Sequence, residues 1–285
     1  MTAIDLDHLR QWEGRQETAG DTIEPAKVRA MAATLDWERA PEPGEELPRP
    51  WHWLYFLPAV RQSKIGRDGH PERGGFLPPV PLPRRMWASG SVEFLAPLRI
   101  GDQATRTSTV KSVTHKRGAS GDLVFVTVEH AITAADRLAI RERQNLVYRE
   151  DPDPGAPPPQ PLAPPAAAQF GREWTPDPVL LFRYSALTFN GHRIHYDRDY
   201  AVQEEGYAGL VVHGPLSATL LLDLVRTHCP EQQVGYYDYR AVRPLTEGAP
   251  FRVEGCRADG GLSLWVVDHG GALTMQASVG AERPA

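Results

Sequence analysis

The sequence is organised around the stretch FRYSALTFNGHRIHYD at residues 182–197, where an apolar run gives way to a cluster of polar groups. The cluster holds an asparagine, an arginine and two histidines around a single glycine. A second unusual piece, VVHGP at residues 211–215, opens a strongly apolar segment. Histidine exchanges protons near neutral pH, and a Gly-Pro helix start leaves backbone N–H groups available to developing negative charge. Together the two pieces predict a site for acid/base chemistry.

Composition and charge exclude several classes of protein. The chain has 285 residues, 41% of them hydrophobic, which suits a soluble globular protein with a sizeable core. Its formal net charge is −5 and it has no block of basic residues, so we expect no nucleic-acid partner. No run approaches the roughly 20 apolar residues of a membrane span, and residues 1–15 lack a signal-peptide core. Cys229 and Cys256 form no CxxC pair, which is typical of the reducing cytoplasm.

Helix and strand patterns recur in the same order in the two halves of the chain. In the first half, a helix is predicted over 24–36 and strands over 86–94, 103–115, 123–133 and 138–148. In the second half, a helix apolar on most faces is predicted over 215–228, followed by strands over 235–242, 250–257, 262–267 and 272–279. The pattern predicts an α+β fold in which each half is a long helix wrapped by a curved antiparallel sheet.

The clearest domain boundary is a Pro/Ala-rich linker at 150–171, which suits neither a helix nor a ladder strand. We therefore expect an N-terminal half at 1–149 and a C-terminal half at 172–285. Residues 37–85 are irregular, and loops of this length commonly bind a ligand. Their aromatic segment WHWLYF, residues 51–56, fits a buried strand and a ligand wall equally well. Residues 70–83 are expected to form a mobile surface loop.

The central motif resembles that of the MaoC-like hydratases and dehydratases of acyl-thioesters. SALTFNGHRIHYD at 185–197 is similar to one branch, which includes mesaconyl-C4-CoA hydratases, itaconyl-CoA hydratases and mitochondrial-type 3-hydroxyacyl-thioester dehydratases. The first half of the chain is similar to the N-terminal half of the same branch at residues 22–36, at PLPRRMWA (81–88) and at PLRIGD (97–102). The resemblance implies a double hot-dog α+β fold, an acyl-CoA substrate, no cofactor or metal, and a homodimer. The loop at 37–85 would then help to enclose the acyl-CoA.

The motif departs from the general MaoC-like pattern at the position of one catalytic acid. That pattern places an aspartate and an asparagine before the histidine. Here they fall on Asn190 and His192, and only the histidine is kept, as His195. An amide is not a base at neutral pH, although the branch as a whole carries the asparagine. The second acid/base group is therefore unassigned.

The resemblance and the residue chemistry assign candidate catalytic roles. His195 is the expected general acid/base. Asn190 would orient the water or the substrate, or it would simply cap the turn at Gly191. His192 would supply a second proton site or hold one tautomer of His195. The backbone N–H of Gly214, at a helix start, would stabilise the enolate-like thioester oxygen.

Charged parts of the substrate need cations. Arg193, Arg84 and Arg85 are candidates for the CoA phosphates or for a second carboxylate on the acyl chain, although a surface salt bridge is the competing reading for any single arginine. Tyr184 and His213 are further candidates for substrate contact. The spacing of the histidines matches no known zinc pattern, so we expect no metal site.

The function that the resemblance implies is reversible hydration of an α,β-unsaturated acyl-CoA. A branched C5 dicarboxylic acyl group is the first choice, so that itaconyl-CoA or mesaconyl-C4-CoA would give citramalyl-CoA. One alternative is a 3-hydroxyacyl-thioester dehydratase of fatty-acid metabolism. The other is a non-catalytic acyl-CoA-binding protein.

Overall fold

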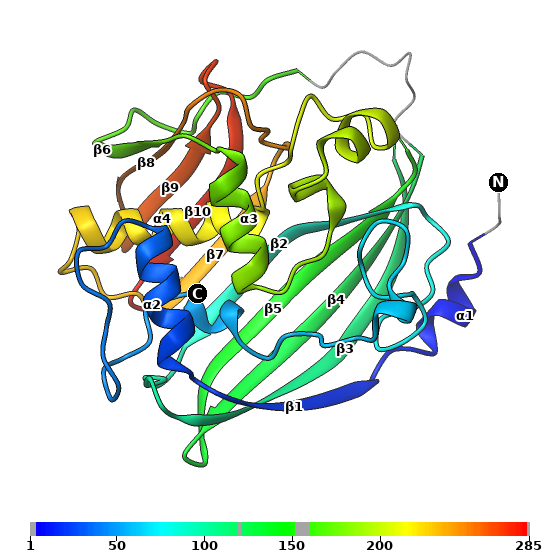
Figure 1. Ribbon diagram of the computed structural model, residues 1–285, viewed down its shortest axis with the longest axis horizontal. Coiled ribbons are helices and arrows are strands. Elements are labelled where there is room, and N and C mark those ends of the chain that lie inside the picture. Colours follow the sequence, from blue (N-terminus) through cyan, green and yellow to red (C-terminus); the bar gives the residue numbers. More distant parts are fainter. Residues whose placement is uncertain (1–3, 119–120, 152–159, 284–285) are drawn as a thin grey trace.

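A single antiparallel sheet of ten strands organises the protein (Figure 1). The computed structural model describes residues 4–118, 121–151 and 160–283. Neighbouring strands follow the order β1-β3-β4-β5-β2-β7-β10-β9-β8-β6. The strands are β1 (Gln16–Thr22), β2 (Arg84–Phe94), β3 (Gln103–Gly118), β4 (Gly121–Ala134), β5 (Arg137–Arg149), β6 (Phe170–Trp174), β7 (Tyr236–Ala241), β8 (Phe251–Ala258), β9 (Gly261–Val267) and β10 (Leu273–Gly280).

The sheet consists of two half-sheets with the same strand order. Read from its outer edge inward, the first is β1-β3-β4-β5-β2 and the second is β6-β8-β9-β10-β7. They form one continuous surface, rather than the two sheets expected, because β2 pairs with β5 on one side and with β7 on the other. The two edge strands, β1 and β6, were not anticipated. β6 overlaps the end of the expected linker at 150–171, of which residues 152–159 lie outside the described residues.

The helices differ between the two halves. The predicted buried helix in the second half is confirmed as α4 (Gly214–His228), whose residues 216–225 are all buried and which packs on β6, β8, β9 and β10. In the first half, α2 (Pro25–Thr34) is shorter and packs against α3 (Pro178–Leu187). In Figure 1 these two helices lie side by side, away from β3 and β4. The face of the first half-sheet is therefore not filled by a helix of its own.

The long irregular segment is more ordered than its composition suggests. The aromatic segment forms a short 3₁₀ helix (Trp51–Leu54), so the strand alternative is wrong. A second 3₁₀ turn covers Gln62–Lys64, and a short helix, α1 (Leu6–Arg10), precedes the sheet. Residues 70–83 are not a surface loop, because Val80 and Leu82 are buried and the Arg73 guanidinium donates to the carbonyl of Val80 at 2.6 Å.

Aromatic rings cover the seam between the half-sheets. Trp87 of β2 stacks on Tyr239 of β7 with ring centroids 4.2 Å apart. Trp53 meets the edges of both rings, at 5.6 and 5.8 Å. Beneath them Gly90 pairs with Gln144 and with Tyr239. The seam is thus a tightly packed interior junction.

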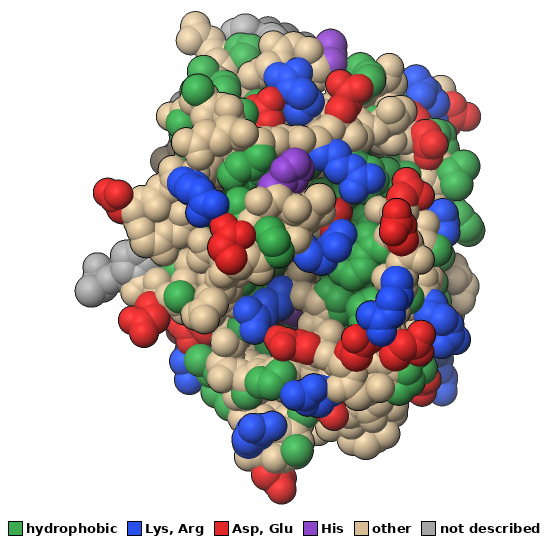
Figure 2. All heavy atoms as spheres, turned by 90° about the vertical axis from the view of Figure 1, so that its left-hand side faces the viewer, with side chains coloured by type: hydrophobic (Ala, Val, Ile, Leu, Met, Phe, Trp, Pro, Cys, Tyr) green, Lys and Arg blue, Asp and Glu red, His purple; other side chains and the backbone are tan. Residues whose placement is uncertain are grey.

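The outer surface carries charges of both signs. Figure 2 shows Lys and Arg side chains interspersed with Asp and Glu over one face, without a continuous basic area. Among the helices of the described residues, none is both long and apolar enough to cross a membrane.

The close packing at the seam predicts that Gly90 does not tolerate a larger residue. A Cβ at residue 90 would lie 2.1 Å from the Tyr239 hydroxyl and 2.6 Å from the Arg143 carbonyl oxygen. We expect Gly90→Ala to lower the free energy of unfolding by about 1–3 kcal/mol, because the stacked ring and the strand backbone must both shift. Urea unfolding measures this. Gly20→Ala in β1 is the matched control, since a Cβ there meets nothing within 4 Å. Equal stability of the two variants would contradict the account.

Candidate active site

A cavity of about 1340 Å³ lies against the face of the first half-sheet. β4 and β5 contribute Val128, Ile132, Leu146 and Tyr148 to its walls, and the loop at 52–77 and the motif at 182–196 contribute much of the rest. No residue of α2 lines it. Its volume exceeds that of ordinary small-molecule pockets, so it suits an extended ligand.

Four histidine rings, here called the histidine row, lie in succession beside this cavity. The centroid of His70 lies 4.0 Å from that of His192, which lies 5.4 Å from that of His195. The rings of His195 and His213 stack at 3.7 Å. His70 comes from the first half of the chain and the others from the second. Of the four, only His70 lines the cavity.

His195 is held in one tautomer by the backbone. It ends the short 3₁₀ helix Arg193–His195, and its Nδ1 lies 2.7 Å from the carbonyl oxygen of Val211. A carbonyl only accepts, so Nδ1 carries the proton and Nε2 keeps its lone pair. Burial lowers the pKa of His195 to about 3, against a smaller opposing effect of the hydrogen bond. At neutral pH the ring is therefore uncharged and able to accept a proton. It retains 7% exposure, one layer behind the cavity wall.

The start of α4 places His213 and Gly214 beside the row. His213 is fully buried, and its Nε2 lies 2.8 Å from the hydroxyl of Ser185. The ring of Tyr184 meets it edge-on at 5.0 Å. Tyr184 and Ser185 line the cavity, whereas His213 lies behind them. Gly214 is the first residue of α4, and a Cβ there would touch the ring of Trp87 at 2.9 Å.

Asn190 and His192 take structural partners within the motif. The amide oxygen of Asn190 accepts the backbone N–H of His192 at 3.0 Å, so the turn-capping contact is present, and the side chain also lines the cavity. Nε2 of His192 lies 3.6 Å from a carboxylate oxygen of Glu205. Its ring is packed between those of His70 and His195.

The three candidate arginines differ in their availability. Arg84 does not line the cavity, and its Nε donates to Asp151 at 2.7 Å. Arg193 reaches the cavity edge but is bound to Asp197 at 2.7 Å and covers the ring of Tyr200 at 4.1 Å. Arg85 lines the cavity and makes no ion pair within the described part of the chain. Arg85 is therefore the predicted arginine that can meet a ligand charge.

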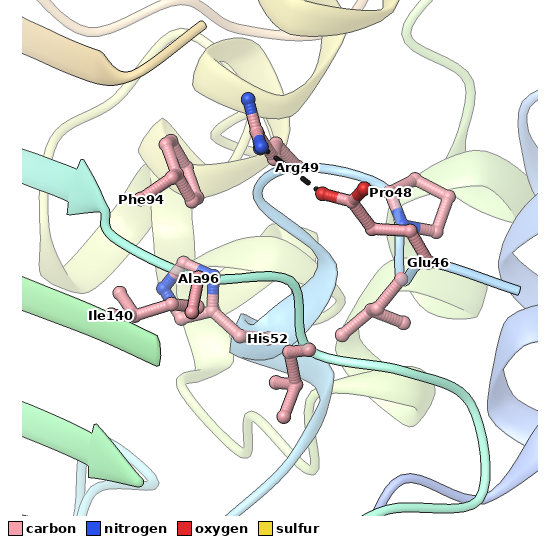
Figure 3. Close-up of a pocket in the computed structure, with 9 residues that line it drawn as sticks. Glu46, Pro48, Arg49, His52, Phe94, Ala96 and Ile140 are labelled. Atoms are coloured by element: carbon pink, nitrogen blue, oxygen red, sulfur yellow. Dashed lines mark hydrogen bonds and ion pairs between the residues drawn. The ribbon is translucent and has the colours of Figure 1, made fainter. Parts of the chain in front are cut away.

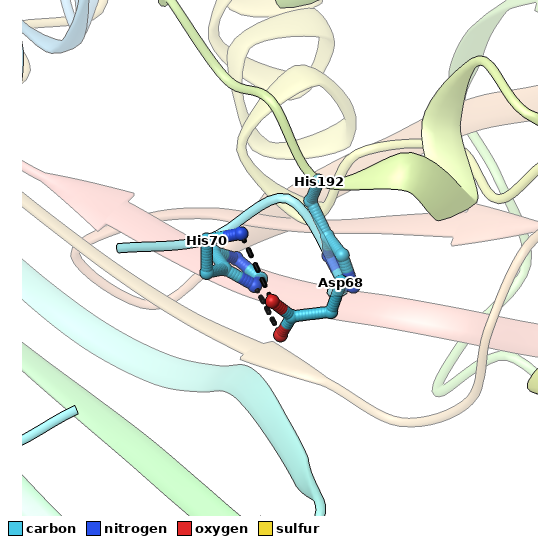
Figure 4. Close-up of side chains that lie close together, drawn as sticks. All are labelled: Asp68, His70 and His192. Atoms are coloured by element: carbon cyan, nitrogen blue, oxygen red, sulfur yellow. Dashed lines mark hydrogen bonds and ion pairs between the residues drawn. The ribbon is translucent and has the colours of Figure 1, made fainter. Parts of the chain in front are cut away.

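Asp68 and His70 belong to the site but were not predicted. Nδ1 of His70 lies 3.0 Å from the Asp68 carboxylate, which also accepts the His70 backbone N–H at 3.0 Å (Figure 4). Gly69 between them approaches the motif so closely that a Cβ would lie 1.8 Å from the carbonyl oxygen of Gly191. The signal in the sequence that could have identified this pair is the motif Asp68-Gly69-His70 in a glycine-rich segment.

A second buried polar cluster lies further along the cavity. Glu142 is 2% exposed and its carboxylate accepts from His52 at 3.0 Å, Trp53 at 2.9 Å and Gln144 at 2.8 Å. Burial alone would raise the pKa of Glu142, but the hydrogen bond and charge of His52 bring it to about 2. A separate pocket of about 10 Å³ opens behind His52, where Arg49 binds Glu46 (Figure 3). That pocket holds roughly one water.

Comparisons with known proteins identify the family of the chain. A sequence profile of hydroxyacyl-thioester dehydratase type 2 matches residues 50–247, which include both His70 and His195. The mesaconyl-C(4)-CoA hydratase of Chloroflexus aurantiacus is 51% identical over 246 residues, covering 85% of this chain and 86% of the relative.

Two solved structures support the fold. HtdX from Mycobacterium tuberculosis superposes with a TM-score of 0.68 at 18% identity, covering 93% of this chain and 99% of that chain. Another M. tuberculosis protein, described as having a double hot-dog fold, superposes with a TM-score of 0.56 at 14% identity over 94% of this chain and 96% of that chain. The expected double hot-dog α+β fold is thereby confirmed. The profile match and the 51% identity show that the chain belongs to the hydroxyacyl-thioester dehydratase type 2 family.

Proposed function

We propose that the protein is an enzyme, a hydratase that reversibly adds water to an α,β-unsaturated acyl-CoA. The observation that carries the proposal is the uncharged His195, fixed on Val211 through Nδ1, whose Nε2 makes no hydrogen bond within the described residues, close to a cavity large enough for an acyl-CoA. The identity to a mesaconyl-C(4)-CoA hydratase supports the branched C5 dicarboxylic substrates, mesaconyl-C4-CoA or itaconyl-CoA, with citramalyl-CoA as product.

The chemistry follows from the positions of His195 and Gly214. Nε2 of His195 takes a proton from water as the oxygen bonds to the β-carbon. The π electrons move toward the thioester oxygen, where the N–H at the positive end of α4 stabilises them. The imidazolium then returns its proton to the α-carbon, so one water is consumed and the imidazole is regenerated. The reverse sequence is dehydration.

Arg85 supplies the charge that a dicarboxylic substrate requires. It lines the cavity from β2, and it lies close enough to His70 to lower the pKa of that ring. A guanidinium binds a carboxylate through two parallel hydrogen bonds. We propose Arg85, rather than Arg84, for the second carboxylate. Arg193 and Tyr184 remain candidates for contacts with the rest of the acyl-CoA.

The runner-up function is dehydration of 3-hydroxyacyl thioesters of fatty-acid metabolism. The apolar side chains that β4 and β5 place along the cavity, such as Val128, Ile132 and Leu146, favour it, because they would suit a longer acyl chain. Other features remain predictions: the division into 1–149 and 172–285 around the linker, a homodimer and a cytoplasmic location. Both cysteines are free and buried, which agrees with that location.

The first test of the function is turnover of three thioesters. Incubation with mesaconyl-C4-CoA, itaconyl-CoA and crotonyl-CoA should give a product one water heavier from the C5 diacids, with loss of the enoyl-thioester absorbance. His195→Asn should lower kcat by about 10²–10⁴-fold, because the proton acceptor is lost. His269→Asn, on an exposed turn, is the matched control and should keep wild-type kcat. No turnover by the wild type would overturn the hydratase proposal, and retained binding without turnover would favour an acyl-CoA-binding protein.

The lowered pKa of His195 predicts a pH dependence of stability. The folded pKa of about 3 lies below the unfolded value of about 6.5. Between these values the unfolded chain binds the extra proton, so the free energy of unfolding falls as the pH is lowered, by at most about 1.4 kcal/mol per pH unit for one group. Urea unfolding between about pH 7 and 4 should therefore show a shallower slope for His195→Gln than for wild type. Ring ¹⁵N shifts should show Nδ1 protonated at neutral pH, and an imidazolium there would contradict the assignment.

Substrate selectivity tests the role of Arg85. Hydrogen bonds to a charged group contribute about 1.5–3 kcal/mol, so Arg85→Gln should lower kcat/KM for the C5 diacid thioesters by about 10–100-fold. Crotonyl-CoA lacks the second carboxylate, so kcat/KM for this substrate should change little in the variant. Arg84→Gln is the matched control, since that guanidinium is held by Asp151 outside the cavity. Equal losses on all three substrates would assign Arg85 a structural role instead.

A further inference from the structure

Asp68 and His70 form a carboxylate–histidine pair that no part of the proposed mechanism uses. Asp68 binds the ring at Nδ1, 3.0 Å away, and binds the backbone N–H of the same residue with its other oxygen. Because an ionised carboxylate only accepts, Nδ1 must carry the proton. The pair therefore fixes His70 in the tautomer whose Nε2 is an acceptor, the same state in which the Val211 carbonyl holds His195.

The loop that carries this pair is fastened to the motif by backbone contacts. The backbone N–H of Arg193 donates to the carbonyl of Asp68 at 2.9 Å. Gly69 has a φ of +90° and meets Gly191 with no room for a Cβ, so both positions require glycine. The ring of His70 then packs against that of His192 at a tilt of 42°, and the ring of His192 meets that of His195 edge-on. The pair is thus placed by the same motif that places His195.

The position of His70 relative to the cavity distinguishes it from the rest of the row. It lines the cavity wall with 20% of its side chain exposed, whereas His195 and His192 lie behind that wall. Arg85, the proposed carboxylate ligand, lies near enough to influence it electrostatically. A substrate held by Arg85 therefore occupies the same cavity that His70 lines.

Two other roles for the same side chains fit the geometry less well. Ligand atoms of Asp68, His70 and His192 lie within 4.8 Å of one another, a set that is able to hold a metal ion. However, both oxygens of the Asp68 carboxylate already accept hydrogen bonds from His70. One accepts the backbone N–H and the other accepts the ring Nδ1–H. If Asp68 and His70 served only to hold the loop in place, the ring of His70 would have no reason to line the cavity, which it does.

We propose that Asp68 and His70 complete the active site by binding the attacking water. Resting on the proposed hydratase function, the inference deepens it: Nε2 of His70, on the cavity wall, accepts one O–H of the attacking water, and the proton of the other O–H passes to His195. The water oxygen bonds to the β-carbon, the α-carbon receives the proton back from His195, and His70 changes no proton. His70 is a catalytic residue because it touches the reacting water, and Asp68 is a positioning residue.

The test compares three variants in the full chain with mesaconyl-C4-CoA. His70→Asn keeps an amide donor for Asp68 but has no counterpart of Nε2, and we expect kcat to fall about 10²-fold with KM within about threefold. Asp68→Asn lets the ring adopt the other tautomer, and a loss of similar size is expected. His70→Ala should regain part of its kcat on addition of imidazole, which a structural role would not produce.

The chain offers a matched control for the pair. His115 and Asp122 also form a histidine–carboxylate pair, with Nε2 of His115 2.8 Å from the carboxylate, on the β3–β4 hairpin and away from the cavity, so Asp122→Asn should leave kcat unchanged. Wild-type kcat in His70→Asn, or no imidazole rescue of His70→Ala, would overturn this inference and leave the proposed function standing. Loss of wild-type activity in EDTA with recovery in Zn²⁺ would replace the water-binding pair by a metal site. A wild type without turnover would overturn the proposed function and this inference together.

Discussion

The pairing of β2 with β7 is the constraint on which the rest of the structure depends. It joins two half-sheets into one surface and fixes where the second half's buried helix begins relative to the first half's open face. Trp87 of β2 lies against Gly214 at the start of α4 and stacks on Tyr239 of β7. One aromatic ring therefore links the seam, the helix start and the cavity wall. A shift of this seam would move the start of α4, which carries the proposed oxyanion donor, relative to the first half-sheet.

The unequal use of helices explains why the protein has a cavity at all. In the second half, α4 covers its half-sheet with side chains buried on every face. In the first half, α2 packs on α3, and the equivalent face is left to line a space of about 1340 Å³. The polar groups on that face need partners because buried polar groups are costly when unpaired. Glu142 meets this need through three hydrogen bonds.

Sequence reasoning succeeded where local pattern and burial agree. The apolar residues of 216–225 predicted a buried helix, and the alternation through Val124, Val126 and Val128 predicted a strand. Both predictions held because the spacing of apolar residues in each segment matches the side chains that the segment buries. β1 escaped prediction because its residues are polar and mostly exposed, and its strand conformation comes from pairing with β3. The candidate site was recovered in part: His195, Asn190, Tyr184 and Arg85 are near the cavity or on it. His70 was missed because its place depends on a contact between Gly69 and Gly191, far apart in the chain, and no local pattern reports such a contact.

The low basicity of the buried histidines bears on which substrate suits the site. A general base works best when its pKa lies near the working pH, yet the protein groups alone hold the pKa of His195 and of His70 at about 3. Nearby negative charge favours the imidazolium and raises the pKa of a histidine. A dicarboxylic acyl-CoA brings such a charge in its second carboxylate, and by pairing with Arg85 it also weakens a cation that lowers the pKa of His70. A fatty acyl chain does neither. The low pKa values keep both rings uncharged at neutral pH, and an anionic group that pairs with Arg85 would raise the basicity of His70, which Arg85 lowers.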